Sequence, residues 1–255
     1  MSDVRFDVDG RVGIITIDRP GKRNCLDRDS AHTFASLVTG IEDDDDLWAG
    51  IIAGEGGVFC SGADLKSIAA EGFGWVLEPE GHFAGMTRRR RRKVFIAAVD
   101  GLAFGGGCEI AIACDLVVAS TASSFAVPEV KRGILAASNA GVVLPRVLPR
   151  NVAMWMLTTG DALSAADAHR YGMVNELVEP GQAVAAAKRL AATITANAPV
   201  AVRCSRELVV VADDLTVEQH FERADELIDV VTATKDNHEG MLAFVEKRAP
   251  VWTGH

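Results

Sequence analysis

The chain has 255 residues, 49% of them hydrophobic, which is enough to bury a full core in one large domain or in one domain with an appendage. Its formal net charge of −9 argues against general affinity for nucleic acid, because that affinity needs clustered cations. The five cysteines are odd in number and lack CxxC spacing, so they indicate neither a disulfide framework nor a zinc site, and no metal is expected. The sequence shows neither a signal-peptide pattern nor an apolar run of membrane-spanning length, so we expect a soluble, cytoplasmic protein that does not bind membranes.

The strands of the first half are predicted by alternation and by short apolar runs. Val4–Val8 and Val12–Ile17 alternate around Asp9-Gly10, which indicates a β-hairpin. Further strands are predicted at Trp48–Ala53, Phe95–Val99 and Leu116–Ala119.

The first helix is predicted at Arg28–Ile41, with Asp27 or Asp29 as its N-cap. The acidic run Glu42–Asp46 that follows is predicted to be a solvated turn. Because strand, loop, helix and strand recur along this half, the sequence predicts α/β crossovers and largely parallel pairing.

The second half is predicted to be mainly helical. Ser164 and Asp167 approximate a capping box, and Gly172 stands where a helix is expected to end. Wide apolar faces on these helices suggest packing against the core or against a sister subunit. The helices are predicted at Val152–Thr159, Ser164–Tyr171, Gln182–Asn197, Pro199–Asp213 and Thr216–Thr234.

A glycine-rich segment in the middle of the chain points to chemistry. Gly105, Gly106 and Gly107 open a predicted helix, and Glu109 follows inside an apolar run. Glycine lets the backbone approach a ligand, and the free amides at a helix start favour developing negative charge. Burying a carboxylate in apolar surroundings costs free energy unless the group is paired, is protonated or takes part in the chemistry of the site. The alternative is a turn that only permits tight helix–sheet packing, with a glutamate that points to solvent.

A second segment, Val58–Lys66, repeats this pattern. A buried strand ends in Ser61, Gly62 and Ala63, after which Asp64 can cap a helix and Lys66 adds charge. Two such turns can aim two backbone N–H groups at one oxygen and so form an oxyanion hole.

Four segments of the chain carry a family resemblance: Phe59–Lys66, Ile96–Glu109, Ala113–Ala119 and Phe125–Val130. In this order they resemble the crotonase (enoyl-CoA hydratase/isomerase) superfamily, and the resemblance is collinear from about Val12 to the C-terminal segment that begins at Phe244. It implies an α/β fold in which residues 1–195 form a crotonase-like ββα spiral that binds acyl-CoA. Residues 196–255 would then form a C-terminal helical trimerisation region.

The resemblance also implies a ligand and an assembly. The thioester carbonyl of an acyl-CoA would lie between the backbone N–H groups of Ala63 and Gly106. Coenzyme A would enter only as part of the substrate, no other cofactor is implied, and the chain would assemble as a homotrimer or a dimer of trimers. For each cation, ordinary surface charge is the alternative to CoA contact, and Asp64 also has a purely structural interpretation. The implied substrate-binding residues are Lys22, Arg23, Ser61, Gly62, Asp64, Leu65, Lys66, Phe244 and Lys247, the last two reaching the CoA of a neighbouring subunit.

Glu109 and Glu129 match both acid positions of the hydratase pattern. Hydration of a 2-enoyl thioester needs a base that activates water at C3 and an acid that protonates C2. By resemblance, Glu129 is the proton donor and Glu109 holds and activates the water, which predicts an enoyl-CoA hydratase, a lyase of the β-oxidation type. Three alternatives remain. One of the two glutamates is only a remnant salt-bridge residue, the chain is an isomerase, or the chain is a specialised dehydratase.

The loop after Gly133 departs from the family pattern. Ala136 replaces a proline, and Asn139 and Ala140 replace a glycine pair. We interpret Asn139 as the cap of the next helix; a polar contact near the water or the acyl chain is the alternative.

The run Arg88–Lys93 contains six successive cations. It lacks interleaved aromatic residues, so we interpret it as a solvated helix that can contact a CoA phosphate. Asp115 is interpreted as a structural residue. The alternative is a catalytically idle relative that uses this run to bind RNA or a protein partner, although no nucleic-acid partner is expected.

Overall fold

Six strands form the main sheet: β1 (Val4–Asp9), β2 (Val12–Ile17), β3 (Ala49–Gly54), β4 (Val94–Val99), β6 (Leu116–Ser120) and β9 (Glu176–Val178). In the computed structural model, which describes residues 3–77 and 79–255, they are ordered β1-β2-β3-β4-β6-β9. β1 and β2 pair antiparallel, whereas the other neighbours are parallel. The predicted hairpin and the predicted parallel sheet are therefore confirmed.

A second, smaller sheet contains β5 (Leu102–Phe104), β7 (Ser124–Ala126) and β8 (Leu163–Ser164). β5 pairs parallel with β7, and β7 pairs antiparallel with β8. A single bridge from Cys60 to Ala103 ties the loop after β3 to this sheet, and another from Ala63 to Leu26 ties the same loop to the segment before α1. The sequence predicted only a turn at β5, because a strand of three residues next to glycines has no readable alternation.

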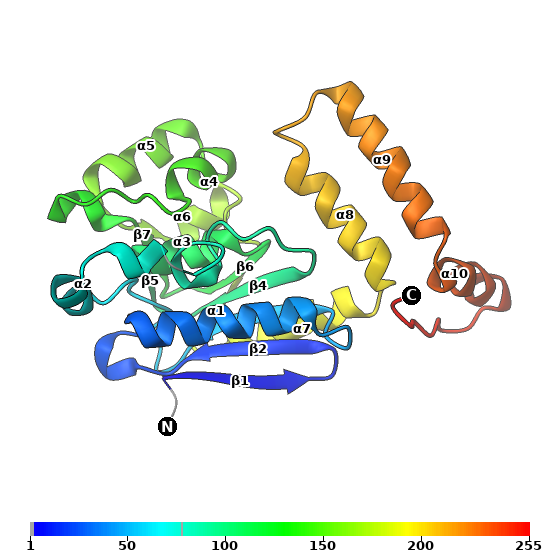
Figure 1. The fold of residues 1–255 in the computed structure, drawn as a ribbon, viewed down its shortest axis with the longest axis horizontal. Coiled ribbons are helices and arrows are strands. Elements are labelled where there is room, and N and C mark those ends of the chain that lie inside the picture. Colours follow the sequence, from blue (N-terminus) through cyan, green and yellow to red (C-terminus); the bar gives the residue numbers. More distant parts are fainter. Residues whose placement is uncertain (1–2, 78) are drawn as a thin grey trace.

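Two helices cover opposite faces of the main sheet (Figure 1). α1 (Arg28–Asp43) begins at the predicted cap Asp27 and packs Phe34 against one face. α7 (Ala183–Thr195) packs a row of alanines against the other face. Neighbouring residues of one strand, such as Ile51 and Ile52, belong to the two different cores because side chains alternate along a strand.

The middle of the chain forms short helices around the second sheet. The predicted helix at 164–171 is confirmed, with Ser164 as its N-cap and Gly172 just beyond its end at φ +91°. The helices are α2 (Leu65–Glu71), α3 (Gly106–Ala113), α4 (Ala140–Val147), α5 (Arg150–Thr159) and α6 (Ala165–Arg170), with 3-10 turns η1 (Pro20–Lys22), η2 (Gly74–Leu77), η3 (Phe83–Gly85) and η4 (Pro128–Arg132).

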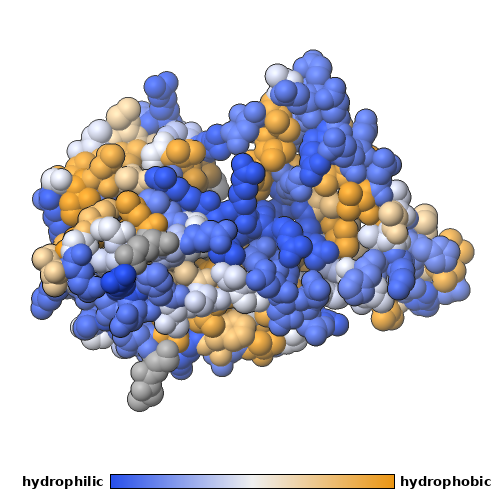
Figure 2. All heavy atoms as spheres, viewed as in Figure 1, coloured by the Kyte–Doolittle hydropathy of each residue, from blue (hydrophilic) through white to orange (hydrophobic). Residues whose placement is uncertain are grey.

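The last part of the chain extends away from the sheets as a helical arm made of α8 (Pro199–Val211), α9 (Val217–Thr232) and α10 (Lys235–Glu246) (Figure 1). α8 and α9 were predicted, whereas α10 was not. Apolar side chains such as Val209 and Phe221 are exposed on the arm. Figure 2 shows hydrophobic patches, in orange, on the surface of the arm. The division at 195/196 and the role of the arm in assembly stay predictions. None of the helices in the described ranges has both the length and the apolar character needed to cross a bilayer.

The basic run is not a solvated helix, so that prediction was wrong. Its residues are irregular, and Lys93 is fully buried. The Lys93 ammonium donates to the carbonyl of Ile41 at 2.7 Å and to that of Asp44 at 2.6 Å, while Arg91 pairs with Asp115 at 3.2 Å. Lys93 and Arg91 thus have hydrogen-bond and ion-pair partners within the protein, whereas in a solvated helix their charged groups would face water.

The acidic run is also not simply a solvated turn. Glu42 lies inside α1, is only 5% exposed, and accepts hydrogen bonds from the backbone amides of Arg92 and Lys93 at 2.9 and 3.1 Å. The acidic and basic runs therefore bind each other across about fifty positions of the sequence, which explains why each looks solvated when it is read alone.

Candidate active site

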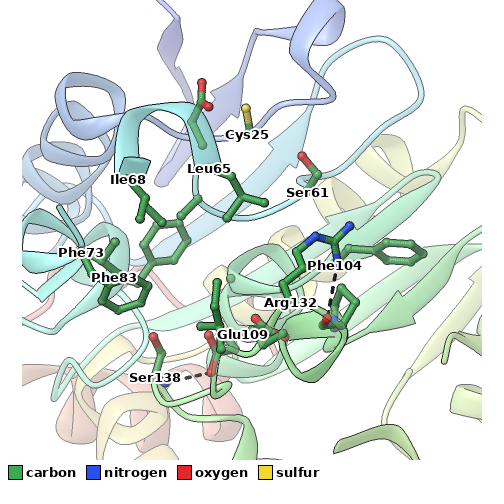
Figure 3. A pocket seen from close by; sticks show the side chains of 18 of the residues that line it. Cys25, Ser61, Leu65, Ile68, Phe73, Phe83, Phe104, Glu109, Arg132 and Ser138 are labelled. Carbon is green, nitrogen blue, oxygen red and sulfur yellow. Dashed lines mark hydrogen bonds between the residues drawn. The ribbon is translucent and has the colours of Figure 1, made fainter. Parts of the chain in front are cut away.

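A cavity of about 580 Å³ opens between α2, the turn before η3, the start of α3 and η4 (Figure 3). Its apolar walls come mainly from the first half of the chain, and its polar groups come both from the segments before α1 and at the start of α2 and from α3, η4 and the loop after η4. Apolar lining residues include Leu65, Ile68, Phe73, Val76, Phe83 and Phe104. Phe73, Val76 and Phe83, which come from the segment between α2 and β4, thus line the cavity.

The two glycine loops meet at one edge of this cavity. A Cβ built on Gly62, whose φ is +91°, would lie only 2.8 Å from the amide nitrogen of Gly106. Gly106 is the first residue of α3, where helix amides have no intrahelical partner. The bridge to Leu26 uses the amide of Asp64 and the carbonyl of Gly62, which leaves the neighbouring amide of Ala63 without a backbone partner in the described chain. Ala63 and Gly106, the residues of the predicted donor pair, both line the cavity, and their role as donors stays a prediction.

Close packing of neighbouring groups also requires glycine at positions 106 and 107. A Cβ on Gly106 would lie 2.4 Å from the ring of Phe83, and one on Gly107 would lie 2.1 Å from the carbonyl oxygen of Cys60. Glycine is therefore required here for close packing, and this requirement is compatible with a role of the Gly106 amide as a hydrogen-bond donor.

Glu109 is buried in the first turn of α3, with 3% of its surface exposed. Its Oε1 atom accepts hydrogen bonds from the backbone amides of Ser138, Asn139 and Ala140 at 3.0, 3.0 and 3.2 Å. Burial raises the pKa of Glu109, and the hydrogen bonds from these residues oppose that rise. The start of α4 therefore holds one oxygen of this carboxyl group, and Glu109 lines the cavity.

Glu129 reaches the same cavity from η4. Burial, together with the charge of Glu109, raises the pKa of Glu129 to about 7. Its Oε2 atom is buried and has no hydrogen-bond partner among the described residues. Its Oε1 atom lies 3.1 Å from where a Cβ on Gly105 would stand, so this glycine also makes room for the carboxyl group.

Asn139 stands at the N-cap position of α4, but its side chain does not cap that helix. Its Nδ2 atom instead donates to the backbone carbonyl of Glu109 at 3.0 Å, and its Oδ1 atom is buried without a partner among the described residues. The capping interpretation was therefore wrong for the side chain. The departure from the family pattern at 136–140 builds a backbone cradle for Glu109.

Most of the other predicted binding residues surround the cavity. Asp64 caps α2 by accepting from the amide of Lys66 at 2.9 Å, as the structural interpretation predicted. Phe244 and Lys247 do not line the cavity: they lie at the end of α10, in the arm. The predicted residues that line it are Lys22, Arg23, Ser61, Asp64, Leu65 and Lys66. In the described ranges no group of three or more His, Cys, Asp and Glu could hold a metal ion.

Three polar lining residues were not predicted: His82, Arg132 and Ser138. The sequence does contain a signal for Arg132. This residue follows Glu129 by three positions, and residues i and i+3 share a face in a 3-10 helix. Ser138 lies in the departing loop that the sequence flagged. His82 has no local signal, because its partner is 56 positions away.

Comparison with known proteins gives consistent results over the whole length. A model of the enoyl-CoA hydratase/isomerase family matches residues 7–255. The (E)-benzylidenesuccinyl-CoA hydratase of Thauera aromatica is 35% identical over 254 residues, which cover 98% of this chain and 99% of that protein. The carnitinyl-CoA dehydratase of Salmonella arizonae is 38% identical, covering 99% and 98%. Among solved structures, an enoyl-CoA hydratase from Mycobacterium tuberculosis H37Rv has a TM-score of 0.95 and 39% identity, and each chain covers 99% of the other.

Proposed function

The chain belongs to the enoyl-CoA hydratase/isomerase family of the crotonase superfamily, and we propose that it is an enoyl-CoA hydratase. In this proposal it adds water in syn fashion across the 2,3 double bond of a trans-2-enoyl-CoA and releases a 3-hydroxyacyl-CoA. The same site can run the reaction backwards as a dehydratase.

The first part of this proposal is supported by Ala63 and Gly106, which both line the cavity, with Gly106 at the start of α3. They would donate to the thioester oxygen, which gains negative charge when an oxygen adds to C3. Each such preorganised donor is typically worth a factor on the order of 10²–10³ in rate.

The different environments of the two glutamates carry the proposal. Glu109, anchored through Oε1 by three amides, suits a base that takes a proton from water while the water oxygen bonds to C3. Glu129, whose pKa is raised by burial to about 7, suits an acid that is partly protonated at neutral pH and gives its proton to C2. The two transfers together add one water molecule to the double bond.

The remaining roles follow from the family. Lys22, Arg23 and Lys66 would contact the CoA phosphates, and Ser61, Gly62, Asp64 and Leu65 would shape the site around the thioester. Phe244 and Lys247 would reach the CoA of a neighbouring subunit in a homotrimer or a dimer of trimers, for which the exposed apolar arm provides a surface. CoA would enter only with the substrate, and no further cofactor is proposed.

A specialised acyl-CoA hydratase or dehydratase is the second candidate. The observation that favours it is the loop 136–140, which departs from the common pattern next to Glu109, together with relatives named for a benzylidenesuccinyl-CoA and a carnitinyl-CoA. The RNA-binding alternative has less support, because Arg88, Arg91 and Lys93 are engaged in contacts within the chain.

The test is an assay of trans-2-enoyl-CoA thioesters of increasing chain length, with branched and carboxylated members, followed by mass-spectrometric identification of products. Hydration of at least one thioester is expected, and Glu129→Gln should lower kcat by a factor of about 10²–10⁴ while the thioester still binds. Binding without turnover of any thioester would contradict the proposal. An isomerised product would support an isomerase instead.

A further inference from the structure

Three successive peptide groups bind the carboxyl group of Glu109. Its Oε1 atom accepts from the amides of Ser138, Asn139 and Ala140 at 3.0, 3.0 and 3.2 Å, and Figure 3 draws the bond from Ser138 as a dashed line. Each of these amides shares a planar trans peptide group with the carbonyl of the preceding residue, and the N–H and C=O of such a group point in opposite directions. A partner that binds the carbonyl therefore also fixes where the amide points.

The third peptide group is fixed by helix α4. The carbonyl of Asn139 accepts from the amides of Val142 and Val143, both at 2.9 Å, in the first turn of that helix. The first two peptide groups lie before the helix, so their carbonyls, on Ala137 and Ser138, are outside its hydrogen-bond pattern. These two carbonyls need a partner from another part of the chain.

Arg88 supplies this partner. Its Nε atom donates to the carbonyl of Ser138 at 2.7 Å, and its Nη2 atom donates to the carbonyl of Ala137. A guanidinium group presents its N–H donors in a rigid planar fork, so one side chain can hold two successive carbonyls in a fixed relation. Its positive charge also polarises both peptide groups, which strengthens the hydrogen bonds that their amides give to Glu109. Two parallel links thus run from Arg88 through the backbone to Glu109.

The turn that carries Arg88 is itself well fixed. The amide of Arg88 donates to the carbonyl of Gly81 at 2.8 Å, which closes the turn. A Cβ on Gly85 would lie 2.5 Å from the Cβ of Ala35, so the turn packs closely against α1. Although Arg88 is exposed, it therefore reaches the loop from a backbone that is held in place.

Few other charged groups face Glu109. Glu129 faces it from η4, with Arg132 on the same short helix, and both line the cavity. The thiols of Cys60 and Cys108 stay neutral because burial raises their pKa. The strands that pack against α3, namely β4, β5 and β6, contain no ionisable side chain.

His82 is a further titratable group near the loop. Its Nδ1 atom lies 3.0 Å from Ser138 Oγ. Burial, and then the charge of Arg88, lower the pKa of His82, so its ring is neutral at pH 7. On α4, Arg146 pairs with carboxylates of the segment after α8. A test of Arg88 must therefore separate its effect from the titration of His82.

We propose that Arg88 is a positioning residue for the hydration reaction, because it holds two of the three amides that bind Glu109 through the carbonyls of their peptide groups. The proposal rests on the hydratase function, in which Glu109 takes a proton from water. With Arg88 in place, both amides point at Oε1 and favour the ionised carboxylate that a base requires. Without Arg88 the two peptide groups can rotate, their amides donate less well, and Glu109 becomes easier to protonate.

The test is the pH profile of kcat/KM for Arg88→Ala and Arg88→Lys. Arg88→Ala should move the acidic limb up by about 0.5–1 pH unit and lower kcat at pH 6 by a factor of about 3–10, with KM changed less than about twofold. Arg88→Lys keeps the charge but not the fork, so it should recover only part of the profile. Arg90→Ala is the matched control and should leave the profile unchanged, since Arg90 belongs to the same run and is exposed.

The comparison is repeated in a His82→Asn background, which removes the imidazole. The same upward shift between the parent and Arg88→Ala is expected there, because the links from Arg88 to Glu109 run through the backbone. A shift that appears only when His82 is present would assign the effect to the imidazole and overturn the proposal.

An acidic limb that does not move in Arg88→Ala would also overturn the proposal. A rise in KM alone would indicate a guanidinium that binds a CoA phosphate, and a fall in unfolding temperature alone would indicate a merely structural contact. A second readout needs no turnover: the ¹³C titration of the Glu109 carboxyl, assigned by its absence in Glu109→Gln. A higher midpoint in Arg88→Ala supports the positioning role even if no enoyl-CoA is hydrated, and the lack of turnover would then reject only the hydratase function. An unchanged midpoint rejects the positioning role whatever the chain catalyses.

Discussion

At the scale of single residues, the site is built from two carboxyl groups with contrasting surroundings. Glu109 has three backbone donors on one oxygen, whereas Glu129 has a buried oxygen with no partner in the described chain. Burial alone would make both groups weak acids, so the amides at the start of α4 create the difference between them. Identical side chains can therefore divide the roles of base and acid.

This contrast predicts how Glu129 affects stability. Burial raises the pKa of Glu129 in the folded state to about 7, above the 4.5 expected for an unfolded chain, so the folded state binds the extra proton between these values. Stability should fall as the pH rises through this window, because ionisation in the folded state is disfavoured. Glu129→Gln should then be more stable than the parent by about 3 kcal/mol at pH 8 and equal to it at pH 4. Urea unfolding at both pH values measures this, and an equal gain at both would contradict it.

At the scale of elements, two glycine loops bring the first turns of α2 and α3 together. Gly62 combines a φ of +91° with a Cβ position 2.8 Å from Gly106 N, so both conformation and space exclude a side chain there. The sequence motifs predicted this meeting. They could not predict the cradle around Glu109, because three amides of a departing loop form it and backbone groups leave no signature in residue identity.

Gly62→Ala tests the role of this contact. The added methyl group should displace the amide of Gly106 and lower kcat by a factor of about 10², while also destabilising the fold by roughly 1–3 kcal/mol. Gly172→Ala is the matched control, since Gly172 has the same φ of +91° and open space around it. It should lose stability but keep its kcat. An equal loss of kcat in both variants would show that backbone strain, not the crowded amide, is responsible.

At the scale of the whole molecule, the helical arm is attached to the core through a cluster of charges. Asp115, just before β6, accepts from Arg206 of α8 at 2.9 Å and from Arg91 at 3.2 Å, and it also accepts from the amide of Phe95 at 2.8 Å. The sequence predicted Asp115 as structural but not its partners, which lie 24 and 91 positions away. Local patterning predicted the sheet, the two acids and both loops, whereas such distant charge pairs exist only once the fold is complete.

Asp115→Ala should destabilise the protein by about 3 kcal/mol, because it leaves two largely buried guanidinium groups without their carboxylate. Thermal unfolding measures this loss, and size-exclusion chromatography reports whether the oligomeric state changes. Asp213→Ala is the control, because Asp213 forms a comparable pair at 3.7 Å that is exposed to solvent and should contribute less than about 1 kcal/mol. Similar losses in both variants would mean that burial does not distinguish the two pairs.

The run Arg88–Lys93 connects distant segments of the molecule, although Arg88, Arg90 and Arg92 are exposed at its surface. Its residues reach the loop that holds Glu109, the end of α1 and the cluster that anchors α8. Neutralising these cations would then lower the amount of folded enzyme in a cell, since a destabilised chain is removed by proteases. A phenotype of such variants would therefore reflect faster degradation of the protein. The basic sequence, read alone, would instead suggest that a bound polyanion had been lost.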